Sequence, residues 1–112
     1  MSGITSHILD TTRGKPAAGV QIELEVKLQD SEWMAAGFGT TDDDGRVSNL
    51  LKNEFKPGEY RISFLVKEYF ESQNVKSFYP TVRIEFIVED TSEHYHVPLL
   101  LNPFGYSTYR GS

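Results

Sequence analysis

The chain has 112 residues, a formal net charge of −5 and no cysteine. This length indicates one domain with a sufficient core, since about 65% of the unfolded surface of such a chain can be buried. The absence of cysteine excludes a disulfide framework and a thiolate metal site, and the mild acidity argues against nucleic acid as a partner. No apolar run approaches the ~20 residues that span a membrane, and the opening MSGITSHILD lacks the features of a secretory signal. We therefore expect a single domain over residues 1–112, with no membrane contact and a cytoplasmic location.

The first part of the chain contains three segments that are typical of strands. Residues from Ile4 to Asp10 are rich in β-branched side chains, and a turn follows them. From Val20 to Leu28, apolar and polar residues alternate, which predicts a strand of an antiparallel sheet with one solvated face. A third strand is predicted from Glu32 to Thr41, where Gly37 and Gly39 indicate a bulge or a close backbone approach.

The middle of the chain is less regular. Asp42 to Gly45 is an acidic turn whose glycine suits a positive φ, and a short strand is expected around Leu50. Alternation returns from Glu59 to Lys67. The alternation of apolar and polar residues ends between Lys67 and Val75, where one or two helical turns fit best.

Three further strands are predicted, from Thr81 to Glu89, from His94 to Leu101 and from Gly105 to Ser112. Seven or eight short strands at regular spacing, with one helical interruption, predict an all-β sandwich. We expect its core to include three aromatic residues, namely Trp33, Phe64 and Phe86.

The C-terminal residues 94–112, HYHVPLLLNPFGYSTYRGS, are rich in aromatic and polar side chains for a chain end. His94 and His96 are two apart on a predicted strand, so they share a face, while Val97 and its apolar neighbours take the other. The histidines are therefore expected to point away from the core. Two interpretations stay open: a pair of surface histidines, or zinc ligands with His7 as the third, although no fourth ligand stands out.

Arg46 directly follows the acidic turn. As a solvated residue it would pair with Asp43 or Asp44, and an exposed pair of this kind contributes little to stability. As a functional residue it would offer a planar donor to a carbonyl group or an anion in a cleft. The turn itself does not match a calcium loop, because its glycine comes too early.

Other catalytic templates do not fit this chain. The Gly37-Phe38-Gly39 segment lacks the third glycine of a dinucleotide loop, and neither a P-loop nor a G-x-S-x-G elbow is present. Ser112 and His96 could suggest a nucleophile with its base, but a terminal serine has no strained turn to hold it. A hydrogen-bonding role is therefore favoured for Ser112.

Three segments stand out as a set: the C-terminal HYHVPLLLNPFGYSTYRGS, the N-terminal ITSHILDTTRGKPAAGV and the central Asp-Gly-Arg at 44–46. Together they resemble the 5-hydroxyisourate hydrolases, the transthyretin-related enzymes of urate breakdown. The resemblance covers essentially the whole chain. Its terminal Tyr-Arg-Gly-Ser is the feature that separates these hydrolases from transthyretin, the hormone carrier of the same fold. One departure is Asn102, which falls in a turn where many members have serine.

The resemblance implies a role for each matched position. His7, Arg46 and His96 correspond to catalytic residues, and Ser112 would orient water or substrate. The residues of the terminal motif that line the site are Tyr109, Arg110, Gly111 and Ser112. His94 lies outside the matched pattern and is interpreted as a surface residue.

The resemblance also implies a fold, an assembly and an activity. The fold is a transthyretin-like sandwich of two four-stranded sheets with one short helix, assembled as a homotetramer (a dimer of dimers) with active sites where dimers meet. The activity is hydrolysis of 5-hydroxyisourate to 2-oxo-4-hydroxy-4-carboxy-5-ureidoimidazoline, by acid–base activation of water, with Arg46 stabilising the oxyanion and no metal or organic cofactor. The alternative is a non-catalytic, transthyretin-like carrier of a small aromatic ligand. A purely structural sandwich would leave the C-terminal segment unexplained.

Overall fold

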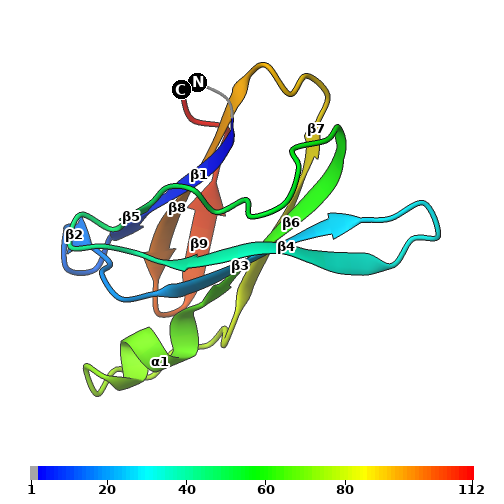
Figure 1. Ribbon diagram of the computed structural model, residues 1–112. Coiled ribbons are helices and arrows are strands. Elements are labelled where there is room, and N and C mark those ends of the chain that lie inside the picture. Colours follow the sequence, from blue (N-terminus) through cyan, green and yellow to red (C-terminus); the bar gives the residue numbers. More distant parts are fainter. Residues whose placement is uncertain (1–2) are drawn as a thin grey trace.

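Two β-sheets pack face to face in the computed structural model, which describes residues 3–112 (Figure 1). One sheet contains β1 (Gly3–Asp10), β2 (Lys15–Pro16), β5 (Arg46–Val47), β8 (His94–Asn102) and β9 (Gly105–Thr108). The other contains β3 (Gln21–Lys27), β4 (Trp33–Thr40), β6 (Gly58–Leu65) and β7 (Val82–Val88). The helix α1 (Val66–Glu71) follows β6 and lies at one end of the molecule. The predicted all-β sandwich with one short helix is confirmed.

The first sheet runs in the order β2-β1-β8-β9, and β5 also pairs with β1. β2 lies opposite Leu9 and Asp10, and β5 lies opposite Ser6 and His7, so these two short strands share one edge of β1. This sheet therefore contains five strands, whereas the resemblance implied four. Because β2 and β5 share one edge of β1, a line drawn across the sheet crosses at most four strands. The second sheet runs in the order β4-β3-β6-β7 and is antiparallel throughout.

β1 and β8 pair in parallel, which brings the two ends of the described chain side by side (Figure 1). Even-numbered residues of β1 and odd-numbered residues of β8 from Tyr95 onward are buried, because successive side chains of a strand point to opposite faces. The residues that alternate with these buried positions include Thr5, His7, His94 and His96, which are half-buried on the outer face. The prediction that His94 and His96 point away from the core is thus correct.

Trp33 lies outside the core, contrary to the prediction. Ala36 of the same strand is buried, and Trp33 is an odd number of positions away, so it faces outward. There the guanidinium carbon of Arg61 lies 4.4 Å from a Trp33 ring centroid. Phe64 is fully buried as expected, and Phe86 is half-buried against the core.

The glycines of β4 mark a close backbone approach, as predicted. A Cβ at Gly37 would collide with the carbonyl oxygen of Leu50, and the pairing of β3 with β4 shifts register between Leu24 and Glu25. The strand expected around Leu50 is an irregular segment that buries Leu50 completely and forms a single bridge at Leu51. The last strand also differs from the prediction, because it ends at Thr108.

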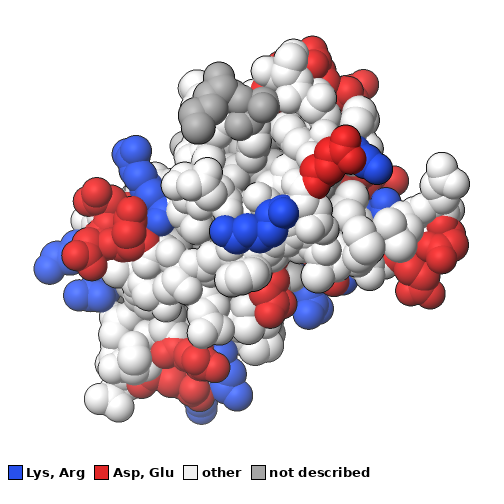
Figure 2. All heavy atoms as spheres, viewed as in Figure 1, with Lys and Arg blue, Asp and Glu red and all other residues white. Residues whose placement is uncertain are grey.

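Charged side chains form small groups of both signs over the face shown in Figure 2. That face therefore carries no continuous basic stripe of the kind that binds nucleic acid. No helix among residues 3–112 is long and apolar enough to cross a membrane. The cytoplasmic location stays a prediction from the sequence.

Candidate active site

Neighbouring strands of the first sheet bring three predicted site residues together. In the antiparallel pair of β1 and β5, His7 lies directly opposite Arg46, a position in which Cβ atoms are about 5 Å apart. In the parallel pair of β1 and β8, Thr5 lies opposite His96. Since Thr5 and His7 share the outer face of β1, Arg46 and His96 converge on one outer surface.

A hollow of about 380 Å³ opens on this surface. Its lining includes the predicted residues Arg46, His96 and Ser112. The remainder of the lining consists of Thr5, Ser6, Asp42, Val47, Ser48 and His94. His7 is not part of this lining, but it is paired with Arg46 and its charge acts on His96. The polar and charged lining suits a small polar ligand.

The surroundings of His96 favour its neutral form. Burial lowers the pKa of this imidazole below its usual 6.5, and the positive charges of His94, His7 and Arg46 lower it further. A neutral imidazole can accept a proton near neutral pH, as a general base must.

The turn before Arg46 fixes the backbone of that residue. The carboxylate of Asp42 accepts hydrogen bonds from the amides of Asp44 at 2.9 Å and Arg46 at 3.0 Å. Gly45 has a φ of 73°, and a Cβ there would lie 2.5 Å from a carbonyl oxygen of β1. The guanidinium of Arg46 makes no ion pair with any residue in the described part of the chain, so the pair with the acidic turn is not observed. Its donors remain available to a ligand.

The chain end returns to β8 after β9. The amide of Gly111 donates a hydrogen bond to the carbonyl oxygen of His96 and forms an isolated bridge with that residue. This contact places Ser112 in the lining of the hollow beside His96. Gly111 and Ser112 therefore lie beside His96 within a single chain.

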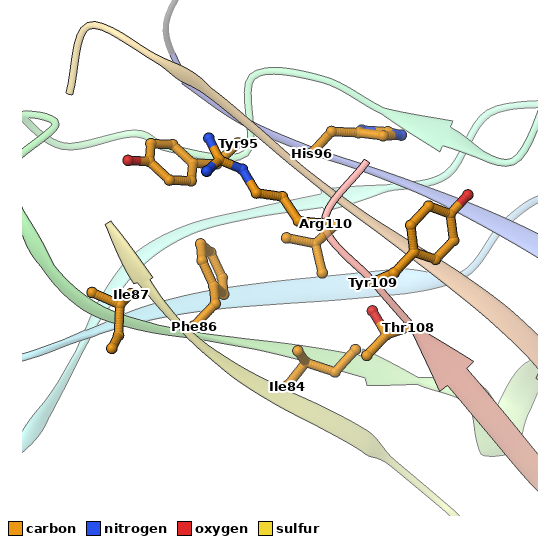
Figure 3. A pocket seen from close by; sticks show the side chains of 9 residues that line it. Ile84, Phe86, Ile87, Tyr95, His96, Thr108, Tyr109 and Arg110 are labelled. Atoms are coloured by element: carbon orange, nitrogen blue, oxygen red, sulfur yellow. The ribbon is translucent and has the colours of Figure 1, made fainter. Parts of the chain in front are cut away.

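Tyr109 and Arg110 lie outside the hollow in the single chain. They line a second, apolar recess of about 130 Å³, which also touches His96. The guanidinium of Arg110 donates to the carboxylate of Glu93 at 2.8 Å and lies 4.4 Å from the ring centroid of Tyr95. Figure 3 shows Arg110 extended toward Tyr95, with Tyr109 turned to the opposite side. Contact of these two residues with a substrate stays a prediction.

Thr5 and His94 are among the lining residues that were not identified as part of the site from the sequence. The hydroxyl oxygen of Thr5 lies 2.9 Å from Nε2 of His94 and 2.8 Å from Nδ1 of His96. The shared face of the two histidines is visible in the sequence, but their joint partner comes from a strand at the other end of the chain. Thr5 becomes recognisable only once β1 and β8 are paired.

The histidines do not form a metal centre with acidic partners. Within residues 3–112, no group of three or more histidine, cysteine, aspartate or glutamate side chains could hold a metal ion. The zinc interpretation of His7, His94 and His96 therefore has no support in the geometry.

The fold and the site define a transthyretin-like protein. Transthyretin from Sparus aurata superposes with a TM-score of 0.93 at 31% identity, covering 99% of this chain and 97% of that one. A 5-hydroxyisourate hydrolase of Klebsiella pneumoniae superposes with a TM-score of 0.87 at 29% identity, covering 100% of both chains.

Sequence comparison defines the family more closely. Residues 4–111 match the HIUase/Transthyretin family. The chain is 48% identical over 110 residues to the 5-hydroxyisourate hydrolase of Salmonella typhimurium, which covers 97% of this chain and 80% of the relative. It is 39% identical over 113 residues to the enzyme of that name from Mus musculus, which covers 99% of this chain and 96% of the relative. The chain belongs to the HIUase/Transthyretin family.

Proposed function

We propose that this protein hydrolyses 5-hydroxyisourate to 2-oxo-4-hydroxy-4-carboxy-5-ureidoimidazoline in urate breakdown. The observation that carries the proposal is the hollow that Arg46, His96 and Ser112 line together, with His7 paired beside Arg46. Relatives at 39% and 48% identity that are named for this activity support it. A hormone channel needs neither the free guanidinium nor the histidine of lowered pKa.

In the proposed reaction, water adds to a ring carbonyl carbon and the adjoining carbon–nitrogen bond breaks. The lowered pKa of His96 suits it to take a proton from the attacking water, and His7 then supplies a proton to the departing nitrogen. Arg46 donates hydrogen bonds to the carbonyl oxygen, on which negative charge develops. The oxygen of the water ends on carbon, one of its protons stays on the new acid group and the other is held by His96, while the nitrogen receives its proton from His7. Proton exchange with solvent then returns both histidines to their starting states, and no redox change occurs.

The C-terminal residues complete the site in this proposal. Ser112 orients the water or the substrate through its hydroxyl or its terminal carboxylate, since it lines the hollow next to His96. Tyr109 and Arg110 bound the site from the neighbouring recess, which shares His96 with the hollow. None of these roles calls for a metal or an organic cofactor, so activity should persist in the presence of a chelator.

We further propose assembly as a homotetramer, a dimer of dimers. β7 and β9 are edge strands of their sheets and border the same recess, so both offer unpaired backbone groups on one side of the sandwich. Large apolar side chains are exposed there, including Ile87 at 65% and Tyr106 at 43%. Light scattering should give a mass near four times 12.7 kDa. A mass of one chain would contradict the assembly.

Ultraviolet absorbance of freshly generated 5-hydroxyisourate tests the proposed activity. We expect the protein to speed the decay over the uncatalysed control and the Arg46→Ala variant to lose this effect. Decay at the uncatalysed rate with both proteins would overturn the enzyme proposal. Ligand-binding assays would then test a transthyretin-like carrier of a small aromatic molecule.

A further inference from the structure

Thr5 lies between two imidazole rings on the outer face of the first sheet. Its hydroxyl oxygen is 2.9 Å from Nε2 of His94 and 2.8 Å from Nδ1 of His96. The two rings are nearly parallel, with an interplanar angle of 17° and centroids 6.3 Å apart. All three residues line the same hollow. One hydroxyl thus contacts both histidines of the strand.

A threonine hydroxyl has one hydrogen to donate and two lone pairs that accept, so it cannot donate to both imidazoles. If Thr5 donates elsewhere, both imidazoles donate to it, and His96 then carries its hydrogen on Nδ1. If Thr5 donates to one of the imidazoles, two arrangements exist. In the first arrangement, Nδ1–H of His96 donates to Thr5, and Thr5 donates to Nε2 of His94. In the second, Nε2–H of His94 donates to Thr5, and Thr5 donates to Nδ1 of His96. In these two arrangements, the tautomers of the two histidines are linked through Thr5.

We infer that Thr5 and His94 are positioning residues that hold His96 in the Nδ1–H tautomer, with its Nε2 unprotonated and free to act as the base. This inference rests on the proposed hydrolysis and extends it, because it assigns the reacting nitrogen. Nε2 of His96 has no hydrogen-bond partner among residues 3–112, whereas Nδ1 is engaged by Thr5. Nε2 is thus the ring nitrogen of His96 left to receive a proton.

Proton balance favours the first arrangement over the second. When His96 takes a proton from water, the proton moves from the water oxygen to Nε2 and the imidazole becomes a cation with an N–H on both nitrogens. Nδ1–H then donates to Thr5 as it did before, so no hydrogen bond reorganises during the step. In the second arrangement, Nε2 already carries the hydrogen and Nδ1 is occupied by Thr5. No lone pair of His96 would then face the water.

In the first arrangement, His94 is the hydrogen-bond acceptor of the Thr5 hydroxyl. Nε2 of His94 receives the Thr5 hydrogen there, so the hydrogen of the His94 ring itself is on Nδ1. Its own contribution is indirect, since Thr5 stands between it and His96. Replacing the ring by one without an acceptor should free Thr5 to donate to His96 instead, which would reverse the tautomer.

The substitution Thr5→Val removes the hydroxyl and keeps the β-branched shape that suits a strand. Thr5→Ser keeps the hydroxyl, and Thr40→Val makes the same change at an exposed position of β4 in the other sheet. Thr5 is only half-buried and lies outside the core, so these variants should fold. His94→Phe removes the acceptor while retaining an aromatic ring.

Ring-nitrogen NMR of histidine-labelled protein reads the tautomer without reference to activity. The chain has only three histidines, so His94→Phe and His7→Gln assign the signals. We expect His96 to be protonated on Nδ1 in the wild type and in Thr5→Ser, and to shift toward Nε2–H in Thr5→Val and His94→Phe. The inference would be overturned if His96 carries its hydrogen on Nε2 in the wild type, or if the His96 tautomer is the same in Thr5→Val as in the wild type.

Turnover of 5-hydroxyisourate provides the second readout. We expect kcat to fall about tenfold or more in Thr5→Val and His94→Phe with KM little changed, and to be restored in Thr5→Ser. Thr40→Val should match the wild type. If the tautomers respond as expected but the wild type is inactive, the proposed hydrolysis is wrong and the positioning of His96 by Thr5 still holds. If the wild type is active but the His96 tautomer does not change in Thr5→Val, only the positioning of His96 by Thr5 is wrong.

Discussion

The amide nitrogen of Gly111 lies 2.8 Å from the carbonyl oxygen of His96, and this bridge holds the chain end against β8. A Cβ at position 111 would lie 2.6 Å from Cδ2 of His96 and 3.0 Å from Cγ of Pro98. The close packing of the chain end on the His96 ring therefore depends on glycine.

The substitution Gly111→Ala should push Ser112 and the His96 ring apart. We expect turnover of 5-hydroxyisourate to fall by about 10²-fold, because displacements near 1 Å in a catalytic site have effects of this size. The melting temperature should change little, since Gly111 is outside the core. Gly105→Ala is the matched control, because a Cβ there comes no closer than 3.8 Å to any neighbour. Full activity in Gly111→Ala would show that the site does not need this contact.

Arg46 should be needed for its shape as well as its charge. We expect Arg46→Ala to lower turnover by ~10²-fold or more, and Arg46→Lys to recover little of it, because an ammonium group cannot donate in a planar fork. Arg13→Ala, at an exposed turn, serves as the control. Steady-state kinetics and light scattering should show loss of kcat with the assembly retained. Near-normal turnover in Arg46→Ala would remove Arg46 from the mechanism.

The lowered pKa of His96 should make the stability of the fold sensitive to mild acid. Below its usual pKa of 6.5, the unfolded chain takes up a proton at His96 that the folded chain resists. The free energy of unfolding should therefore decrease as the pH falls from about 6.5 through the folded pKa, and His96→Asn should flatten this decrease. Urea unfolding at about pH 7 and pH 5.5 measures the difference. An identical pH dependence in wild type and His96→Asn would contradict the lowered pKa.

Removing the last four residues should separate catalysis from folding. Deletion of residues 109–112 takes away Ser112 and the bridge to His96 but none of the buried core. We expect activity to be abolished and the cooperative unfolding transition to remain, as checked by kinetics and circular dichroism. A well-folded truncated protein with full activity would show that the terminal motif has no part in the site.

A buried hydrogen bond between β1 and α1 should stabilise the fold without affecting the site. The hydroxyl of Tyr69 donates to the carboxylate of Asp10 at 2.7 Å, and Asp10 is 1% exposed. Tyr69→Phe should lower the free energy of unfolding by about 1–3 kcal/mol, because it leaves a buried acceptor short of a partner. Thermal unfolding measures this loss, and kcat should be unchanged. A fall in kcat at full stability would link this end of the molecule to the site instead.

Much of the fold could be predicted from local patterns in the sequence. A strand that buries one face selects apolar side chains two residues apart, so β3, β6 and β7 are recognisable from alternation alone. The same rule placed His94 and His96 on the outer face. The glycine pattern of β4 predicted the close approach at Gly37. Trp33 was assigned to the core because of its size, although the parity of its position relative to the buried Ala36 decides its direction.

The arrangement of the site depended on which strands pair, and no local pattern encodes this. Thr5 and His96 are separated by 91 positions and meet only because β1 and β8 pair in parallel. Likewise, the direction of Arg110 is set by Glu93 and Tyr95, which the strand pairing places nearby.

Sequence alone was enough to predict the longer strands, the single helical interruption and the outward direction of the histidines, because burying one face of a strand imposes local alternation. The short strands β2 and β5 were not predicted from it. The tertiary structure alone decided that Thr5 joins His94 to His96 and that Arg110 turns toward Glu93. The physical reason is that strand order and register minimise the free energy of the whole sandwich, through contacts between segments far apart in the chain.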